Sequence, residues 1–374
     1  MELARYLDEL STLVNIDCGT KTVAGVTQVA SIVCEKYRSL GWHAEQVDLG
    51  NQVGHGVFTT NKPHAKSYDV LLVGHLDTVF PEGTVAQRPL THDEKNAYGP
   101  GVADMKGGIL NILWAMRSLD KDVLNNMAIA ITMNPDEETG SVHSKAWIAS
   151  YAKKSRCVLV CEGARVDGSL VKARKGAAMY QLDFTGKASH AGNAPEKGRS
   201  AITELAHWVL ALNQLAQPEQ GTTVNIGTIN GGDAANIVPD HAQAVVDVRF
   251  RCNDEYVRVN KAISEMVKQS FTPDIKIALK PLSLLPAMDP TAETETLMQH
   301  VEQCGDDVGI KVTWQSVGGG SDANHTAALG VPSLDGFGPV GGNFHTPEEY
   351  LDLDSVFPRI KLLARVISTL APSR

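Results

Sequence analysis

The stretch from Val70 to Val79 constrains the fold of this chain more than any other. Four apolar residues run into Gly74, and His75 and Asp77 follow two residues apart. A short apolar run that ends in a glycine predicts a buried strand of an α/β sheet. Side chains at positions i and i+2 project from the same face of a strand. We therefore expect His75 and Asp77 to leave the strand together, where open α/β sheets bind their ligands.

Two later apolar runs also lead into acidic residues. Met127–Met133 is followed by Asn-Pro and then by the acidic triplet 136–138, and Cys157–Cys161 ends on Glu162. Because a proline ends the hydrogen-bond ladder of a strand, the triplet is expected on the following loop. A helix is predicted from Ser141, as its N-cap, to about Lys154. Three buried strands thus end in histidine or carboxylate side chains, which predicts one polar site beyond the strand ends.

The pattern changes at about Arg174 and predicts an inserted domain. Alternate residues from Ala178 to Phe184 are apolar, as in a half-buried strand, and the order β-α-β-β-α-β follows. We predict an α/β fold with a mixed sheet flanked by helices over residues 1–174 and 288–374. Residues 175–287 are predicted to form an inserted α+β domain of the ferredoxin-like type, with Ser283–Pro290 as the return linker.

Composition excludes several classes of partner and site. The 374 residues carry a formal charge of −9, which argues against a nucleic-acid-binding surface. The first residues lack the basic and apolar regions of a signal peptide, and no apolar run approaches the length of a membrane span. The six cysteines do not form a disulfide framework. We therefore expect a cytoplasmic protein with no membrane partner.

Five side chains are candidate metal ligands: His75, Asp104, Glu138, Glu162 and His345. Two imidazoles and three carboxylates suit two zinc ions if one carboxylate bridges them. Asp104 is the expected bridge, because it is short and lies among glycines. Such a pair of ions can activate a water as hydroxide and polarise a carbonyl group. Glu137 is then the expected general base.

Each of these residues also has a simpler interpretation. His75 and Asp77 suit a hydrogen-bonded pair at a strand end, and the triplet 136–138 suits a solvated acidic turn. Asp104 could cap the helix that follows it. Glu162 suits a surface carboxylate, and His345 suits an ordinary loop histidine. Taken singly these interpretations are the more frequent ones, because short motifs have many false positives.

Six motifs in chain order favour the metal site. Together they resemble the M20 metallopeptidase family (peptidase M20/M25/M40), closest to its glutamate carboxypeptidase, or carboxypeptidase G2-like, branch. The motifs are Gly74-His75-Leu76-Asp77-Thr78, Gly99-Pro100-Gly101-Val102-Ala103-Asp104-Met105-Lys106-Gly107-Gly108, Asp136-Glu137-Glu138-Thr139-Gly140-Ser141, Glu162-Gly163, Gly318-Gly319-Gly320-Ser321-Asp322 and Phe344-His345-Thr346.

The resemblance implies a di-zinc site, in which Co²⁺ or Mn²⁺ could replace zinc. The implied ligands are His75 and Glu162 for one ion, Glu138 and His345 for the other, and Asp104 for both. Asp77 is implied to orient His75, and Glu137 to act as the general base. The implied reaction is release of a C-terminal amino acid from a small peptide or an N-acyl amino acid.

The resemblance also assigns roles to the inserted domain, which in the family makes a homodimer and covers the active site. His190, in Ala188-Ser-His-Ala-Gly192, is implied to reach the active site of the partner subunit and stabilise the oxyanion. Asn236, Arg249 and Ser321 are implied to contact substrate. Outside this context His190 suits a surface loop histidine, and Arg249 suits a solvated arginine on a strand.

The chain departs from the glutamate-selective pattern at one point. No arginine occurs between Arg258 and Arg359, where a second arginine is expected, and Lys280 lacks the guanidinium fork that could replace it. A deacylase or desuccinylase of amino-acid metabolism therefore stays open as an alternative. A single-metal enzyme and a non-catalytic metal-dependent binding protein are further alternatives.

Overall fold

The computed structural model describes residues 2–370. The chain folds into two compact units: a split unit, Met1–Ala173 with Pro290–Arg374, and an inserted unit, Arg174–Asp289. The predicted fold class, an α/β fold that carries an inserted α+β module, is confirmed. None of the helices that residues 2–370 form combines the length and hydropathy that a bilayer span requires.

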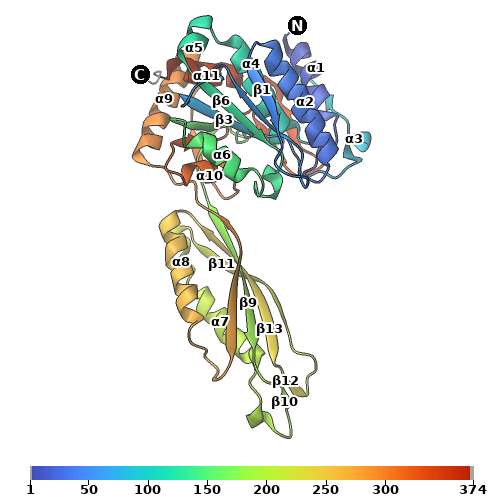
Figure 1. The fold of residues 1–374 in the computed structure, drawn as a ribbon, viewed down its shortest axis with the longest axis vertical. Coiled ribbons are helices and arrows are strands. Elements are labelled where there is room, and N and C mark those ends of the chain that lie inside the picture. The colour runs from blue at the N-terminus through green and yellow to red at the C-terminus, as the bar shows by residue number, and fades with distance from the viewer. Residues whose placement is uncertain (1, 371–374) are drawn as a thin grey trace. The chain divides into compact units, whose positions relative to one another are not determined.

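A mixed six-stranded sheet forms the centre of the split unit (Figure 1). Its order is β1 (His43–Val47), β2 (Gly56–Thr60), β6 (Ile129–Asn134), β3 (Val70–His75), β7 (Val158–Val160) and β16 (Ser333–Leu334). The predicted strand β3 lies between β6 and β7 and is parallel to both. Every residue of β3 is buried, which explains why its sequence is apolar throughout rather than alternating.

Several helices pack on this sheet and against one another. Helix α2 (Val23–Ser39) packs on β1 and β2, while α4 (Gly107–Ser118) packs on β3 and on α11 (Leu353–Thr369). The other helices of the split unit are α1 (Glu2–Val14), α3 (Thr84–Gln87), α5 (Lys121–Asn126), α6 (Lys145–Ala152), α9 (Ala292–Val308) and α10 (Asp322–Ala327). One apolar core joins α1, α2, α4 and α11 to the sheet.

Two smaller sheets in the split unit bring distant segments together. The order of the first is β17 (Gly341–Gly342), β18 (Tyr350–Asp352), β5 (Asn96–Tyr98) and β4 (Thr91–His92). The second pairs β8 (Leu170–Arg174) with β15 (Trp314–Val317). The sequence did not predict the first sheet, because strands of two or three residues carry no periodicity. That sheet joins the segment before Asp104 to the segment that carries His345.

The inserted unit has the predicted β-α-β-β-α-β order. Its antiparallel sheet runs β11 (Thr223–Gly231), β13 (His241–Phe250), β9 (Gly176–Thr185) and β14 (Lys276–Leu285), with helices α7 (Ala201–Asn213) and α8 (Asn253–Met266). Residues from Ala178 to Phe184 alternate between buried and partly exposed positions, as predicted. A ribbon of β10 (Ser189–His190) and β12 (Ile237–Val238) extends this unit.

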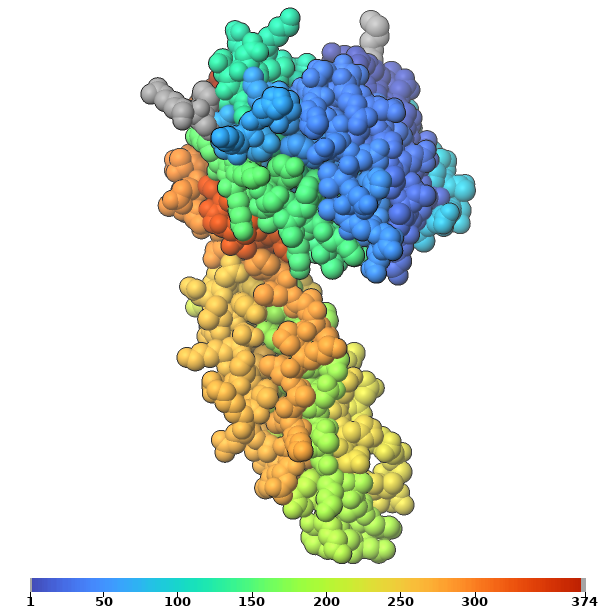
Figure 2. All heavy atoms as spheres, viewed as in Figure 1, coloured from blue at the N-terminus to red at the C-terminus, as the bar shows by residue number. Residues whose placement is uncertain are grey.

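Two sequence predictions are corrected. The return linker is shorter than Ser283–Pro290, because β14 continues to Leu285 and is exposed along the surface of the inserted unit (Figure 2). Pro281 is accommodated because β14 is an edge strand with an irregularity beside the proline. Ser141 does not begin a helix: α6 begins at Lys145, and Ser141 has a left-handed φ of 53°.

The buried central strand generates a stability prediction. Leu72 on β3 has no exposed surface, so Leu72→Ala is expected to lower the free energy of unfolding of the split unit by about 2–5 kcal/mol. Val166 is 68% exposed, so Val166→Ala is the control. It is expected to change the free energy of unfolding by less than about 0.5 kcal/mol. Urea unfolding followed by circular dichroism measures both, and equal effects would contradict the assignment of β3 to the core.

Candidate metal centre

The candidate ligands lie at a strand end and in four loops that meet at one edge of the sheet. His75 ends strand β3, and Glu162 follows strand β7. Glu138 lies in a 3-10 turn, Glu137–Thr139, after β6. Because β3, β6 and β7 are parallel, their carboxyl ends meet at the same edge. Asp104 lies in the turn Val102–Lys106 before α4, and His345 lies between β17 and β18.

The five side chains form two groups of three that share Asp104. In the first group Nε2 of His75 is 3.1 Å from Oδ1 of Asp104 and 3.5 Å from Oε1 of Glu162. In the second group Nε2 of His345 is 3.0 Å from Oδ2 of Asp104 and 3.2 Å from Oε2 of Glu138. Within each group the three ligand atoms lie within 4.8 Å of one another. Each oxygen of Asp104 therefore faces a different imidazole.

The donor set fits two divalent cations. Imidazole nitrogens and carboxylate oxygens are ligands of zinc, and each group offers one of the former and two of the latter. Oε1 of Glu138 is buried and has no hydrogen-bond partner among the described residues. A buried carboxylate oxygen without a partner is costly, and a cation beside it would remove that cost.

The charged side chains of the site also shift one another's pKa values. Burial by itself lowers the pKa of His75, but the carboxylates of Glu162 and Asp104 raise it well above its ordinary value. Hydrogen bonds to Asp104 and Glu138 raise the pKa of His345 to about 10. Burial raises the pKa of Glu162 to about 8, although His75 opposes this shift. Protons therefore compete with cations for these side chains.

Glu137 lies next to the candidate ligand Glu138 but belongs to neither group of three. Burial raises the pKa of Glu137 well above its ordinary value, His75 opposes the shift, and the carboxylates of Glu162 and Asp322 add to it. A carboxyl group with a raised pKa binds a proton more readily than an ordinary one. Glu137 is thus not one of the grouped candidate ligands, and its role as a general base stays a prediction.

Asp77 connects the candidate ligand His75 to the acidic turn. Nδ1 of His75 is 3.0 Å from the main-chain oxygen of Asp77 and 3.3 Å from its carboxylate. The same carboxylate accepts the N–H groups of Glu137 and Glu138, each at 3.2 Å, and the hydroxyl of Thr20 at 2.6 Å. The sequence predicted that Asp77 lies behind His75, but it did not predict the bonds to the turn.

Sequence reasoning missed a buried polar network behind the turn. Ser141 donates to Asp322 at 2.5 Å, and Ser144 donates to Asp136 at 2.5 Å. Asn134 donates to both serines. Burial raises the pKa of Asp322 to about 7. The motif around Asp322 was visible in the sequence, but no spacing rule connects it to residues 134–144.

A cleft of about 470 Å³ opens beside Glu138. Its walls come from two loops, Gly19–Thr22 and Thr78–Glu82, together with Glu138 and Thr139. The two loops are joined by backbone hydrogen bonds between Thr20 and Thr78 and between Thr78 and Cys18. The cleft is within the size range of small-molecule sites and contacts a candidate ligand.

The predicted substrate-contacting residues lie in different places. His190 and Asn236 are close, because the N–H of Ala191 donates to the carbonyl oxygen of Asn236 at 2.9 Å. Arg249 lies near the other end of β13 and pairs with Asp247 at 2.9 Å. Ser321 is buried, caps α10 and donates to Asp335 at 2.6 Å. Its hydroxyl is thus occupied within the protein, and substrate contact by Ser321 stays a prediction.

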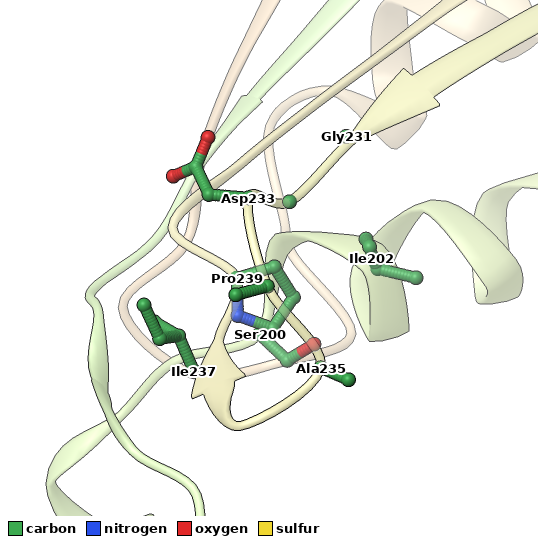
Figure 3. A pocket seen from close by; sticks show the side chains of 9 residues that line it. Ser200, Ile202, Gly231, Asp233, Ala235, Ile237 and Pro239 are labelled. Atoms are coloured by element: carbon green, nitrogen blue, oxygen red, sulfur yellow. The ribbon is translucent and has the colours of Figure 1, made fainter.

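The inserted unit contains a second cleft, of about 530 Å³, between the start of α7 and the loop that follows β11 (Figure 3). Ser200, Ile202, Ile237 and Pro239 line it. Asp233, at its rim, also belongs to an exposed group with Asp240 and His241. Exposed acidic groups are common without an ion, so this group is not assigned as a metal site.

Comparison with known proteins identifies the family. The family model described as peptidase family M20/M25/M40 matches residues 71–369. The chain belongs to this family. It is 30% identical to carboxypeptidase G2 from Pseudomonas sp. (strain RS-16), over 100% of this chain and 91% of that protein. The M20 chain is therefore a hydrolase of the metallopeptidase type, as predicted.

Other similar proteins are named for different activities. The chain is 27% identical to an acetylornithine deacetylase from Edwardsiella ictaluri, over 80% of this chain and 79% of that protein. The solved structure of aminopeptidase PepT from Bacillus cereus matches with a TM-score of 0.80 at 24% identity, covering 98% of both chains. An M20 family metallo-carboxypeptidase from Sulfolobus solfataricus matches with a TM-score of 0.70 at 19% identity, covering 98% of this chain and 99% of that one. These two solved structures are similar to this chain in fold.

The raised pKa values predict how metal affinity depends on pH. Protons leave His345, His75 and Glu162 as the pH rises through their raised pKa values, so metal affinity is expected to increase with pH. Between pH 6 and pH 7 the increase is expected to be about tenfold for each proton displaced. Competition with a chromophoric chelator at several pH values measures it. A metal affinity that does not change over this range would contradict the assignment of these ligands.

Proposed function

We propose that this M20 hydrolase is a di-zinc amidohydrolase that releases a C-terminal amino acid from small peptides or N-acyl amino acids. The observation that carries the proposal is the pair of ligand groups that share Asp104. When bound, two cations supply an activated water and polarise the substrate carbonyl. Co²⁺ or Mn²⁺ would suit the same oxygen and nitrogen ligands.

Residues of the chain then have separate roles in the reaction. Glu137 takes a proton from the attacking water and returns it to the leaving nitrogen. Asp77 holds His75 and the turn of Glu137 in register through its main-chain oxygen and its carboxylate. The cleft beside Glu138 offers space for one side of the substrate, with hydroxyl groups on one wall and Val79 and Phe80 on the other.

We further propose that His190 stabilises the oxyanion. Its ring is exposed, and Nδ1 accepts the N–H groups of Gly192 and Asn193, each at 3.1 Å. A neutral imidazole whose Nδ1 accepts carries its proton on Nε2. Nε2 is therefore the donor and points away from the loop that holds the ring, which is what a contact with an oxyanion requires.

Strand geometry supports action of His190 and Arg249 from different subunits. Strand β9 ends opposite His241, just before the ribbon of His190, whereas Arg249 lies eight residues along β13 from His241. Eight residues of an antiparallel strand span roughly 27 Å. A dipeptide spans roughly 7 Å, so both side chains of one subunit do not reach one such substrate.

A homodimer formed through the inserted unit is part of the proposal. Strand β11 is at the edge of its sheet, and apolar side chains lie exposed on it and on α7: Ile229 is 53% exposed, Leu210 is 66% and Ile202 is 44%. An unpaired sheet edge beside exposed apolar side chains is a suitable surface for a second copy of the chain.

An N-acyl-amino-acid deacylase is the second candidate function. The similarity to an acetylornithine deacetylase favours it, as does the missing second arginine. A panel of N-acyl amino acids and of α- and γ-linked glutamyl peptides separates the two candidates by kcat/KM. No hydrolysis of any member by zinc- or cobalt-loaded protein would favour a non-catalytic binding protein, and metal analysis per subunit tests the single-metal alternative.

Glu137→Gln is expected to retain both metals and to lower kcat by at least about 100-fold, because it removes the base and leaves the ligands in place. Glu138→Gln is the matched control, since the neighbouring substitution alters a ligand and is expected to weaken metal binding. Metal content and kcat are measured on the same samples. Near-normal turnover by Glu137→Gln would remove Glu137 from the role of base.

His190→Ala is expected to lower kcat while leaving the dimer and its metals intact. If His190 acts across the subunit interface, mixing His190→Ala with Glu137→Gln produces hybrid dimers in which one site has both residues. Activity of the mixture above that of either variant is then expected, up to about a quarter of the wild-type value when subunits exchange at random. No recovery in exchanged dimers would contradict action in trans.

A further inference from the structure

The carboxylate of Glu349 binds the backbone of the turn that carries Asp104. Its Oε1 accepts the N–H groups of Ala103 at 2.9 Å and of Asp104 at 3.0 Å. Its Oε2 accepts the N–H group of Gly101 at 3.1 Å. Glu349 has no exposed surface, so water does not compete for these bonds. Three backbone N–H groups therefore depend on this one side chain for their hydrogen bonds, and leaving them unpaired in a buried turn would be costly.

Glu349 is at the same time fixed to the loop of His345. Its own N–H donates to the carbonyl oxygen of Thr346 at 3.2 Å, and Thr346 donates to that of Asn343. Strand β18, which begins one residue later, pairs with β17 and with β5. Glu349 thus joins the loop of one candidate ligand to the turn of another.

The loop of His345 needs such support. His345 has φ of 65° and Asn343 has φ of 54°, in the left-handed region that non-glycine residues rarely occupy. Such conformations persist only where neighbouring contacts fix them. The side chain of Asn343 donates to the carbonyl oxygen of Glu348, so the whole turn closes on itself beside Glu349.

We propose that Glu349 is a positioning residue that sets the distance between Asp104 and His345 and thereby the geometry of the shared metal centre. This inference rests on the proposed pair of metal ions. It assigns to Glu349 a role beyond stability, because both segments that it joins carry ligands. A purely structural role would stabilise the split unit and leave the metal ligands where they are.

Cobalt provides a readout that does not depend on activity. The visible absorption bands of Co²⁺ depend on the geometry of its ligands. Glu349→Gln replaces one acceptor oxygen with an amide NH₂ group that must face a backbone N–H. Because this disturbs the turn of Asp104, we expect altered Co²⁺ bands and about tenfold weaker Co²⁺ binding or more. Glu349→Asp keeps the charge but shortens the reach, and serves if Glu349→Gln does not fold.

Glu204 provides a matched control in the inserted unit. It is also fully buried, and its carboxylate accepts the backbone N–H groups of Phe271 at 3.0 Å and of Thr272 at 2.5 Å. Glu204→Gln should cost stability in a comparable way and leave the Co²⁺ bands and affinity unchanged. Wild-type bands and affinity in both Glu349 variants would overturn the positioning role. Absence of Co²⁺ bands from the wild-type protein would instead overturn the proposed metal pair itself.

Discussion

The two oxygens of Asp104 face two different histidines, and the rest of the split unit is arranged to keep them there. Around that carboxylate lie Glu138 and Glu162, close enough that the negative charges repel one another in a partly buried site. Imidazoles alone reduce this repulsion only while they carry protons, which is why their pKa values are raised. Divalent cations would reduce it without protons and would do so at higher pH.

Holding such charges together requires a rigid scaffold, and buried polar bonds provide it. Asp77 holds the acidic turn by two backbone N–H groups. Lys106 is fully buried and donates to the carbonyl oxygen of Leu76, between His75 and Asp77. Ser141 and Asp322 join the acidic turn to helix α10. The segments that carry His75, Asp104 and Glu138 are therefore attached to one another, and not only to their own strands.

The sequence predicted the parts of the fold that have a clear period. Strand β3, the alternation on β9 and the order of elements in the inserted unit follow from the spacing of apolar residues. The five candidate ligands could also be found, because each follows a recognisable strand end or glycine-rich turn. The structure brings these five together.

The parts that could not be predicted depend on contacts between distant segments. The small sheet of β17, β18, β5 and β4 has strands too short to show a pattern, and Glu349 gains its partners only through that sheet. The left-handed conformation of Ser141 accompanies a hydrogen bond to Asp322, far along the chain. The correct length of β14 was missed because Pro286, Pro290 and the lack of periodicity suggested a linker from Ser283, whereas the edge strand continues past Pro281 to Leu285.

The position of the inserted unit in the chain means that the two groups of candidate ligands are completed at different times during synthesis. His75, Asp104 and Glu162 all precede the inserted unit, whereas His345 is translated after it. A growing chain therefore has all the candidate ligands of one group before the ribosome reaches the inserted unit. It obtains the last candidate ligand of the other group only when synthesis is nearly complete. A transcript cut short after the insertion would encode a protein with one intact set of ligands and one that lacks its histidine.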